Sequence, residues 1–317
     1  MQYDLLIIGS GPAGLSAGIY AKRANLKVAI AEKEYEGTGQ IAESGKVDNY
    51  PGLPGISGYE LGEKFREHAI SLGVEFIEKE VVKIEQTESD GEDSKRAYQL
   101  TFEDGSKEKS RTLIYAAGAY PKRGGIKGEE DFLGKGISYC AICDGAFCKG
   151  KTVAVLGGGD SALDDAFYLS ELAEKVYLIH RRETFRGAAA TLEKIKEKEN
   201  VEILLKESAL EITGEKKAEK LLLSSGKRLD INMVFIAYGS HPQTELVKDL
   251  VKLDEAAYII AEENTKAYKL DGKTILEGFY AAGDVRRKEL RQVSTAIADG
   301  ANAATQAAEF IRAQGRA

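Results

Sequence analysis

The sequence predicts an α/β fold of two similar units, and two observations support this prediction. Twice along the 317 residues an apolar, strand-like run enters a glycine-rich turn that opens a helix of small residues. In both copies the next apolar run ends at a polar residue 23 positions after the first glycine, Glu32 in one and His180 in the other. Because a repeat in matching register is highly specific, we predict two Rossmann-like units. Segments alternating at period two predict a small β-meander in each.

In the first copy the run Leu5–Ile8 enters the turn 9–14, and a second strand is predicted over 27–31. Glycines let the backbone approach a pyrophosphate, the helix N-terminus supplies unpaired amides, and an acid at the strand end accepts from a ribose hydroxyl. The alternative is a tight turn with a solvated Glu32. We predict a dinucleotide site with these candidate residues: Gly9, Ser10, Gly11, Pro12, Ala13, Gly14 and Glu32.

The second copy has a basic strand end where the first has an acid. A carboxylate pairs with ribose hydroxyls and repels an added phosphate, whereas guanidinium groups bind that phosphate through paired hydrogen bonds. We therefore expect a nucleotide without a 2′-phosphate in the first site and NADPH in the second. The alternative is a solvated basic corner. The candidate residues are Gly157, Gly159, Asp160, Ser161, Ala162, His180, Arg181, Arg182 and Arg186, with Gly239 after the later apolar run 234–237.

Between the two copies lies a pair of cysteines separated by two residues, Cys140 and Cys143, followed by Asp144. Such a pair closes a small disulfide ring, and the adjacent acid can trade protons with the sulfur that leaves as a thiolate. The alternatives are half of a zinc site or two buried small residues. With three cysteines and three histidines in the chain, no second pair of metal ligands has a useful spacing, which disfavours zinc. Cys148 is expected to be a buried small hydrophobic residue.

Composition and charge exclude several classes of protein. The length fits about two domains. The net charge of −7 argues against nucleic-acid binding, which needs a clustered basic face. No apolar run approaches the ~20 residues of a membrane-spanning helix. Met1–Asp4 lead straight into the first strand with no basic segment, which predicts a cytoplasmic protein. In that reducing compartment a close cysteine pair is expected to cycle between its two redox states.

The segments outside the two units carry weaker signals. The loop 37–52, rich in glycine and proline, connects elements or lines a cofactor. The segment 74–114 alternates, with charged turns at 89–95 and 103–107, and predicts a meander at an edge or lid. Near the end, the run 278–284 is predicted to be a strand entering Gly-Asp, and a helix of small residues is predicted over 293–311. The N-terminus of that helix would stabilise the negative charge of a reduced flavin.

Taken together, the motifs resemble the low-molecular-weight thioredoxin reductases of the pyridine-nucleotide disulfide oxidoreductase superfamily. The resemblance covers nearly the whole chain. It implies an FAD domain made of residues 1–116 and 243–317, with an NADPH domain of residues 117–242 inserted and able to pivot. Homodimers are typical of the family. The resemblance rests on five motifs in family order: Gly9–Gly14, Cys140–Gly145, Gly157–Ala162, His180–Arg186 and Gly283–Gln292.

The resemblance also implies site residues and an activity. Electrons would pass from NADPH to FAD, then to the Cys140–Cys143 disulfide, and then to thioredoxin. Cys143 would be the sulfur on the flavin side, Cys140 would attack the partner, and Asp144 would donate and accept the proton. Beyond the first glycine turn and Glu32, the implied FAD contacts are Lys33, Gly39, Gln40, Asn49, Val81, Gly118, Gly283, Asp284, Arg291, Gln292 and Val293.

Other functions are possible for the same motifs. The acceptor could be a glutaredoxin-like protein or a peroxiredoxin system. A ferredoxin-linked flavin reductase is disfavoured, because such enzymes of similar build lack the cysteine pair. A nucleotide-sensing module with structural cysteines would oxidise no NADPH. Two features depart from the family pattern: Asp164 and Asp165 replace common glutamates, and Ala146 and Cys148 stand where aromatic residues often help dock thioredoxin.

Overall fold

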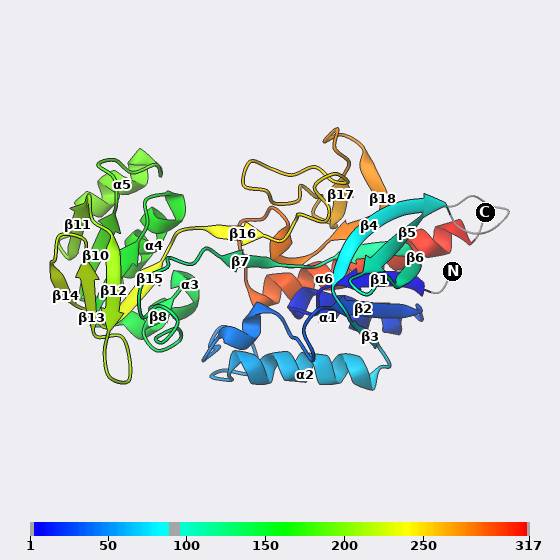
Figure 1. The fold of residues 1–317 in the computed structure, drawn as a ribbon, viewed down its shortest axis with the longest axis horizontal. Helices are drawn as coiled ribbons and strands as arrows, with labels where there is room; N and C mark the ends of the chain where they lie inside the picture. The colour runs from blue at the N-terminus through cyan, green and yellow to red at the C-terminus, as the bar shows by residue number, and fades with distance from the viewer. Residues whose placement is uncertain (1–2, 89–95, 316–317) are drawn as a thin grey trace. The chain divides into compact units, whose positions relative to one another are not determined.

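The computed structural model describes residues 3–88 and 96–315. The charged turn predicted at 89–95 lies outside the described residues. The chain forms two compact units (Figure 1): unit 1 combines the residues up to Tyr120 with those from His241, and unit 2 runs from Pro121 to Ser240. The two segments that join the units, β7 (Ala119–Pro121) and β16 (Ser240–Pro242), pair with each other as a two-stranded sheet.

Unit 1 is built on a sheet whose central strands are parallel, with β1 between β2 and β6. Strand β17 adds antiparallel pairing at one edge, and β4 and β5 continue from β6 as an antiparallel meander. The path of the sheet is β17 (Lys266–Tyr268), β18 (Ile275–Ala281), β6 (Lys107–Tyr115), β1 (Tyr3–Ile8), β2 (Val28–Glu32) and β3 (Glu75–Glu78), with β4 (Val81–Glu88) and β5 (Arg96–Phe102) off this path.

Helices cover one face of this sheet because their small residues allow close approach. The face carries α1 (Pro12–Arg23), α2 (Gly58–Ser71) and α6 (Val293–Gln314). A Cβ atom on Gly300 of α6 would lie 2.1 Å from the Ala13 carbonyl oxygen, so only glycine permits this contact between α1 and α6. At its N-terminus α2 has a reciprocal capping box between Ser57 and Glu60. The opposite face of the sheet packs against the meander and the segment 246–261.

Unit 2 contains a second, fully parallel sheet, with helices on one face and a meander on the other. The strands follow the order β11 (Val201–Leu205), β10 (Lys175–His180), β9 (Thr152–Leu156), β15 (Met233–Ile236) and β8 (Ile137–Ser138). The helices are α3 (Ala141–Asp144), α4 (Asp160–Ser170) and α5 (Ala189–Lys196), with 3₁₀ turn η2 (Gly145–Cys148). The meander is β12 (Ala209–Thr213), β13 (Lys220–Leu223) and β14 (Arg228–Asp230).

The predicted fold class is confirmed, including one meander per unit, but the segment 74–114 lies only partly at an edge, because β3 ends the path of the sheet and β4 pairs with β5 alone, whereas β6 is central. Strand β3 pairs in parallel with β2, and β6 lies in the centre of the sheet between β1 and β18. The reason lies in β6 itself: its charged first half, Lys107–Ser110, pairs with β5, whereas its apolar second half, Thr112–Tyr115, pairs with β1. One strand therefore serves both the meander and the buried sheet.

Candidate functional site

The first glycine turn connects β1 to α1 and is closed by short backbone contacts. The amide of Gly9 donates to the Ala31 carbonyl at 2.9 Å. Gly9 has a φ of 98°, and a Cβ atom there would lie 2.5 Å from the Ala116 carbonyl oxygen. A Cβ atom on Gly14 would lie 1.8 Å from the carbonyl oxygen of Gly9. Both positions therefore require glycine, and the turn presents the N-terminus of α1 at the carboxyl edge of the sheet.

The second glycine turn repeats this geometry between β9 and α4. The amide of Gly157 donates to the Ile179 carbonyl at 3.0 Å, at the same offset along the repeat as Gly9 to Ala31. A Cβ atom on Gly157 would lie 2.5 Å from the Ala237 carbonyl oxygen, as one on Gly9 would meet Ala116. The repeat seen in the sequence is therefore a repeat of backbone hydrogen bonds as well.

The residues that end β2 and β10 both reach back to the second residue of their glycine turn. In unit 1 the Glu32 carboxylate accepts from the Ser10 amide at 2.9 Å. In unit 2 the His180 ring lies over Gly158, where a Cβ atom would come within 2.1 Å of the ring. His180 is buried, its Nε2 atom lies 3.1 Å from the Thr184 carbonyl oxygen, and burial is the main cause that lowers its pKa. His180 thus shapes the turn as a neutral ring.

The charged groups of the second strand end are the arginines that follow His180. Arg181, Arg182 and Arg186 are exposed, and within the described ranges no carboxylate forms an ion pair with them. Backbone contacts hold their segment to the glycine turn: the Arg186 amide donates to the Gly158 carbonyl at 2.7 Å, and the Ala188 amide to Asp160 Oδ1 at 2.7 Å. Three guanidinium groups are therefore free to meet an anion beside the N-terminus of α4.

In unit 1 two further segments converge on the first glycine turn. Gly39, with a φ of 76°, lies so close that a Cβ atom would sit 2.8 Å from the Cα atom of Gly11. Gly283, with a φ of 78°, likewise lies close to α1: a Cβ atom on Gly283 would be 2.9 Å from the Cβ atom of Ala13. The loop that begins at Gly37 and the 3₁₀ turn η3 (Gly283–Val285) therefore flank the N-terminus of α1.

Contacts between distant residues extend this cradle. The Asn49 side-chain amide donates to Gln292 Oε1 at 2.8 Å, although 243 residues separate them. Gln40 opens the 3₁₀ turn η1 (Gln40–Glu43), and Val293 is the first residue of α6. Residues predicted from separate motifs are thus brought together in one unit.

Two buried polar atoms in this cradle lack hydrogen bonds within the described part of the chain: Asp284 Oδ1 and Arg291 Nε. The Lys288 ammonium lies 3.2 Å from Asp284 Oδ1, and it opposes the effect of burial, which raises the pKa of Asp284. The Arg291 guanidinium lies 4.0 Å from the centre of the Tyr258 ring. Because buried polar atoms almost always have partners, these two groups fit a polar ligand such as the expected flavin nucleotide.

The redox centre in unit 2 is a disulfide between Cys140 and Cys143, whose Cα atoms are 5.3 Å apart. Cys140 caps α3: its sulfur accepts from the Cys143 amide at 3.2 Å, and its own amide donates to Ser138 Oγ at 3.0 Å. Behind the ring, Gly145 packs on α4, because a Cβ atom there would lie 2.6 Å from the Tyr168 ring. The cysteine pair is therefore held between β8 and α4.

The groups next to the disulfide differ in their ability to exchange protons. Burial raises the pKa of the Asp144 carboxyl, and the Ser138 hydroxyl offsets part of that effect. A carboxyl with a raised pKa beside a disulfide is suited to accept and return a proton. Burial raises the pKa of the Cys148 thiol to about 12, and its sulfur lies 3.5 Å from Met233 Sδ. Cys148 is thus inert, and its prediction as a buried small residue is confirmed.

A profile of the pyridine nucleotide-disulphide oxidoreductase family matches residues 3–300. The chain belongs to this family. A thioredoxin reductase of Mycoplasma genitalium is 39% identical, over 98% of this chain and 95% of its own. One of Bacillus subtilis is 37% identical, with 98% and 95% covered. The crystal structure of thioredoxin reductase from Streptococcus pyogenes is 36% identical, covers 98% of both chains and superimposes with a TM-score of 0.89.

Four residues that are predicted to contact FAD or NADPH lie apart from the two glycine turns. Lys33 is exposed and Val81 is buried in the apolar core beside β2. Gly118 and Gly239, with φ values of 70° and 87°, lie in the segments that join the units. Within the ranges that the structure describes, none of these four residues forms a hydrogen bond with a glycine turn, so their roles stay predictions.

Sequence reasoning missed a buried ionic network that supports Gly283 and Asp284. On α6, Asp299 pairs with Arg286 at 2.8 Å and with Lys288 at 3.2 Å, and it accepts from the Gly283 amide at 3.0 Å. The signal available in the sequence was two basic residues shortly after Gly-Asp and an acid within a helix made mostly of small residues.

No helix of the described residues is long and apolar enough to cross a bilayer.

Proposed function

We propose that the chain is a thioredoxin-disulfide reductase that uses NADPH as electron donor and FAD as cofactor. The observation that carries this proposal is the Cys140–Cys143 disulfide beside Asp144, in a unit whose nucleotide turn has a basic strand end. Electrons from a nicotinamide can reach a protein disulfide by this route, and the neighbouring carboxyl handles the protons.

The first glycine turn and its neighbours are the proposed FAD site. Bound FAD supplies two-electron chemistry between nicotinamide and disulfide. The amides at the start of α1 bind the pyrophosphate, and Glu32 accepts from a ribose hydroxyl. Asp284 and Arg291 supply the two buried polar atoms that form no hydrogen bond within the described residues. The other proposed contacts are Lys33, Gly39, Gln40, Asn49, Val81, Gly118, Gln292 and Val293.

The second glycine turn is the proposed NADPH site. Amides at the start of α4 bind the pyrophosphate, and Arg181, Arg182 and Arg186 bind the 2′-phosphate. His180 shapes the turn on which they depend. The proposed domains are residues 1–116 with 243–317 for FAD, and 117–242 for NADPH; the division of the structure after Tyr120 and before His241 supports them.

In the proposed cycle the cysteine pair alternates between a disulfide and a dithiol. Two electrons and two protons break the Cys140–Cys143 bond and leave two thiols. The thiolate of Cys140 attacks the disulfide of the partner and forms a mixed disulfide, while one partner sulfur leaves as a thiolate. Cys143 then attacks Cys140, which restores the ring and releases the second partner sulfur. Asp144 accepts the proton when a thiol ionises and returns it to a leaving thiolate.

The decisive experiment separates flavin reduction from thioredoxin reduction. In the FAD-loaded protein, the variants Cys140→Ser and Cys143→Ser are expected to lose their yellow colour with NADPH but to reduce no thioredoxin. Cys148→Ala is the matched control and should keep turnover, because its thiol is buried and inert. A double variant of Cys140 and Cys143 that still reduces thioredoxin would refute the proposal.

The acceptor is the part of the proposal with a specific rival. Ala146 is exposed where the family often has an aromatic residue at the docking site, which favours testing a glutaredoxin-like protein or a peroxiredoxin system as well. Coupled NADPH oxidation with a panel of oxidised acceptors decides between them. We also propose a homodimer acting in the cytoplasm, with no nucleic-acid partner; sedimentation of the FAD-loaded protein tests the assembly.

A further inference from the structure

The side chain directly before the redox ring, Tyr139, is anchored by its hydroxyl to two charged residues. The hydroxyl donates a short hydrogen bond to Glu129 Oε1 and accepts one from Arg123 Nη1 at 3.1 Å. The Arg123 guanidinium also lies 5.2 Å from the centre of the Tyr139 ring. A tyrosine hydroxyl held by a carboxylate on one side and a guanidinium on the other has a single preferred position.

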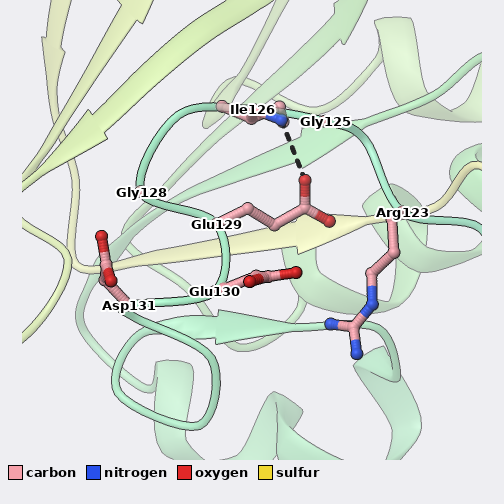
Figure 2. A pocket seen from close by; sticks show the side chains of 7 residues that line it. All are labelled: Arg123, Gly125, Ile126, Gly128, Glu129, Glu130 and Asp131. Carbon is pink, nitrogen blue, oxygen red and sulfur yellow. Dashed lines mark hydrogen bonds between the residues drawn. The ribbon is translucent and has the colours of Figure 1, made fainter.

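Glu129 is a rigid anchor because it is buried and fully bonded. Its side chain is 3% exposed, and its carboxylate accepts from the amides of Gly124 at 2.9 Å and Ile126 at 3.0 Å. Figure 2 shows the Ile126 contact as a dashed line, with Arg123 on another wall of the same pocket. Burial alone would raise the pKa of Glu129, but the hydrogen bonds from Tyr139 and the two amides lower it, so the carboxylate stays charged.

The loop that carries Glu129 is itself tied to the meander of unit 2. The Lys127 amide donates to the Leu210 carbonyl at 3.1 Å, and the Ile212 amide donates to the Lys127 carbonyl at 2.8 Å. Gly128 packs so tightly that a Cβ atom would lie 2.2 Å from the Ile212 carbonyl oxygen. The anchor of Tyr139 is therefore fixed to the meander of unit 2 as well as to its own loop.

The redox ring itself packs on α4 through Gly145 and is joined to β8 through Ser138. Helix α3 spans only Ala141–Asp144, and the ring is closed by the bond between Cys140 and Cys143. On the strand side, Ser138 Oγ accepts from the Cys140 amide at 3.0 Å and donates to the Cys140 carbonyl at 3.3 Å, and neither contact depends on the disulfide bond. Tyr139, between Ser138 and Cys140, adds an anchor to a different part of the unit through its side chain.

We propose that Tyr139, held by Glu129 and Arg123, is a positioning residue that keeps Cys140 beside Cys143 after reduction and thereby sets the reduction potential of the pair. This inference rests on the proposed redox role of the cysteines. Reduction adds two electrons and two protons and converts one disulfide into two thiols. The equilibrium depends on how closely the dithiol is held, so a looser dithiol makes the disulfide easier to reduce.

The test measures that equilibrium directly in the FAD-loaded protein. Tyr139→Phe removes the hydroxyl and keeps the ring. The protein is equilibrated in mixtures of dithiothreitol and its oxidised form, then unfolded in the presence of an alkylating reagent, and the labels are counted by mass. The unfolded chain exposes Cys148, which therefore adds one label throughout. We expect the equilibrium of Y139F to move about tenfold toward the dithiol, which corresponds to a potential about 30 mV less negative.

Tyr177→Phe is the matched control, because Tyr177 lies in the same unit and its hydroxyl has no hydrogen bond among the residues that the structure describes. Its equilibrium should equal that of the wild type. Glu129→Gln should give a shift similar to that of Y139F, and the double variant should shift no further, because both changes break one network.

Three results would overturn the inference: a wild-type equilibrium in Y139F, an equal shift in Y177F, or additive shifts in the double variant. The titration uses neither NADPH nor thioredoxin. A failure here therefore leaves the proposed reductase activity standing, whereas a failure of the coupled assay with a shifted Y139F equilibrium would refute only the assigned partner.

Discussion

Replacing Asp299 by asparagine should weaken unit 1 at the turn that carries Asp284. Asp299 accepts from Gly283 and pairs with Arg286 and Lys288, and the side chains of both cations are at most 10% exposed. Asparagine keeps the shape of the side chain but removes its negative charge and one acceptor. Two buried cations would then face a neutral amide.

The size of the effect follows from the burial of these groups. Removing one partner of a buried ion pair costs about 3–5 kcal/mol, and because asparagine retains one acceptor we expect the low end, about 3 kcal/mol. For a unit of roughly 200 residues this lowers the melting temperature by about 6–12 °C. Binding of FAD would then have to order the loosened turn again, at about 1–2 kcal/mol for one residue, which raises its dissociation constant about tenfold.

Thermal unfolding and the recovery of free flavin fluorescence measure the two effects separately. Asp249→Asn is the control, because the Asp249 carboxylate is exposed. If D299N melts with the wild type and binds FAD equally well, the buried network does not support the turn. If D249N loses as much stability as D299N, the loss reflects charge in general and not these contacts.

Three further predictions concern unit 2. Replacing both Arg181 and Arg182 by alanine should raise the KM for NADPH by on the order of tenfold or more and leave that for NADH nearly unchanged, because charge-assisted contacts to the 2′-phosphate are lost. Gly158→Ala should lower the free energy of unfolding by about 1–3 kcal/mol, because its Cβ atom would meet the His180 ring. Because burial raises the folded-state pKa of Asp144, its ionisation destabilises the fold, so D144N should gain stability over the wild type as the pH rises above 3.8, with no difference below.

Each of these predictions has an outcome that contradicts it. Equal changes of the KM for NADPH and for NADH would show that the two arginines do not bind the 2′-phosphate. Wild-type stability of G158A, with Gly159→Ala as the control in open space, would show that the His180 ring moves away freely. If the stability difference between D144N and the wild type is independent of pH, ionisation of Asp144 does not destabilise the folded state.

Local chemistry explains how much of this protein was predictable. Strand, glycine turn and small-residue helix depend on side-chain size and period within about 25 residues, so both nucleotide-binding units and the cysteine ring followed from neighbouring residues. The edge placement is confirmed for β3 and β4 but not for β6, because β6 changes character along its length: its charged half obeys period two, and its apolar half does not. A window that averages over the strand cannot assign it both to the meander and to the buried parallel strands.

The sequence by itself determined which residues could bind nucleotides and form a disulfide, since those properties belong to residue types at fixed spacing. Only the tertiary structure decided which polar groups of distant segments are in contact and which of them are buried. Asn49 forms a hydrogen bond with Gln292, which is 243 residues away in the sequence. Asp299 accepts a hydrogen bond from the Gly283 amide and forms ion pairs with two cations. Tyr139 is likewise ordinary in the sequence, and its anchor on Glu129 exists because folding encloses both. Burial depends on how distant segments pack, and that information is spread over the whole chain.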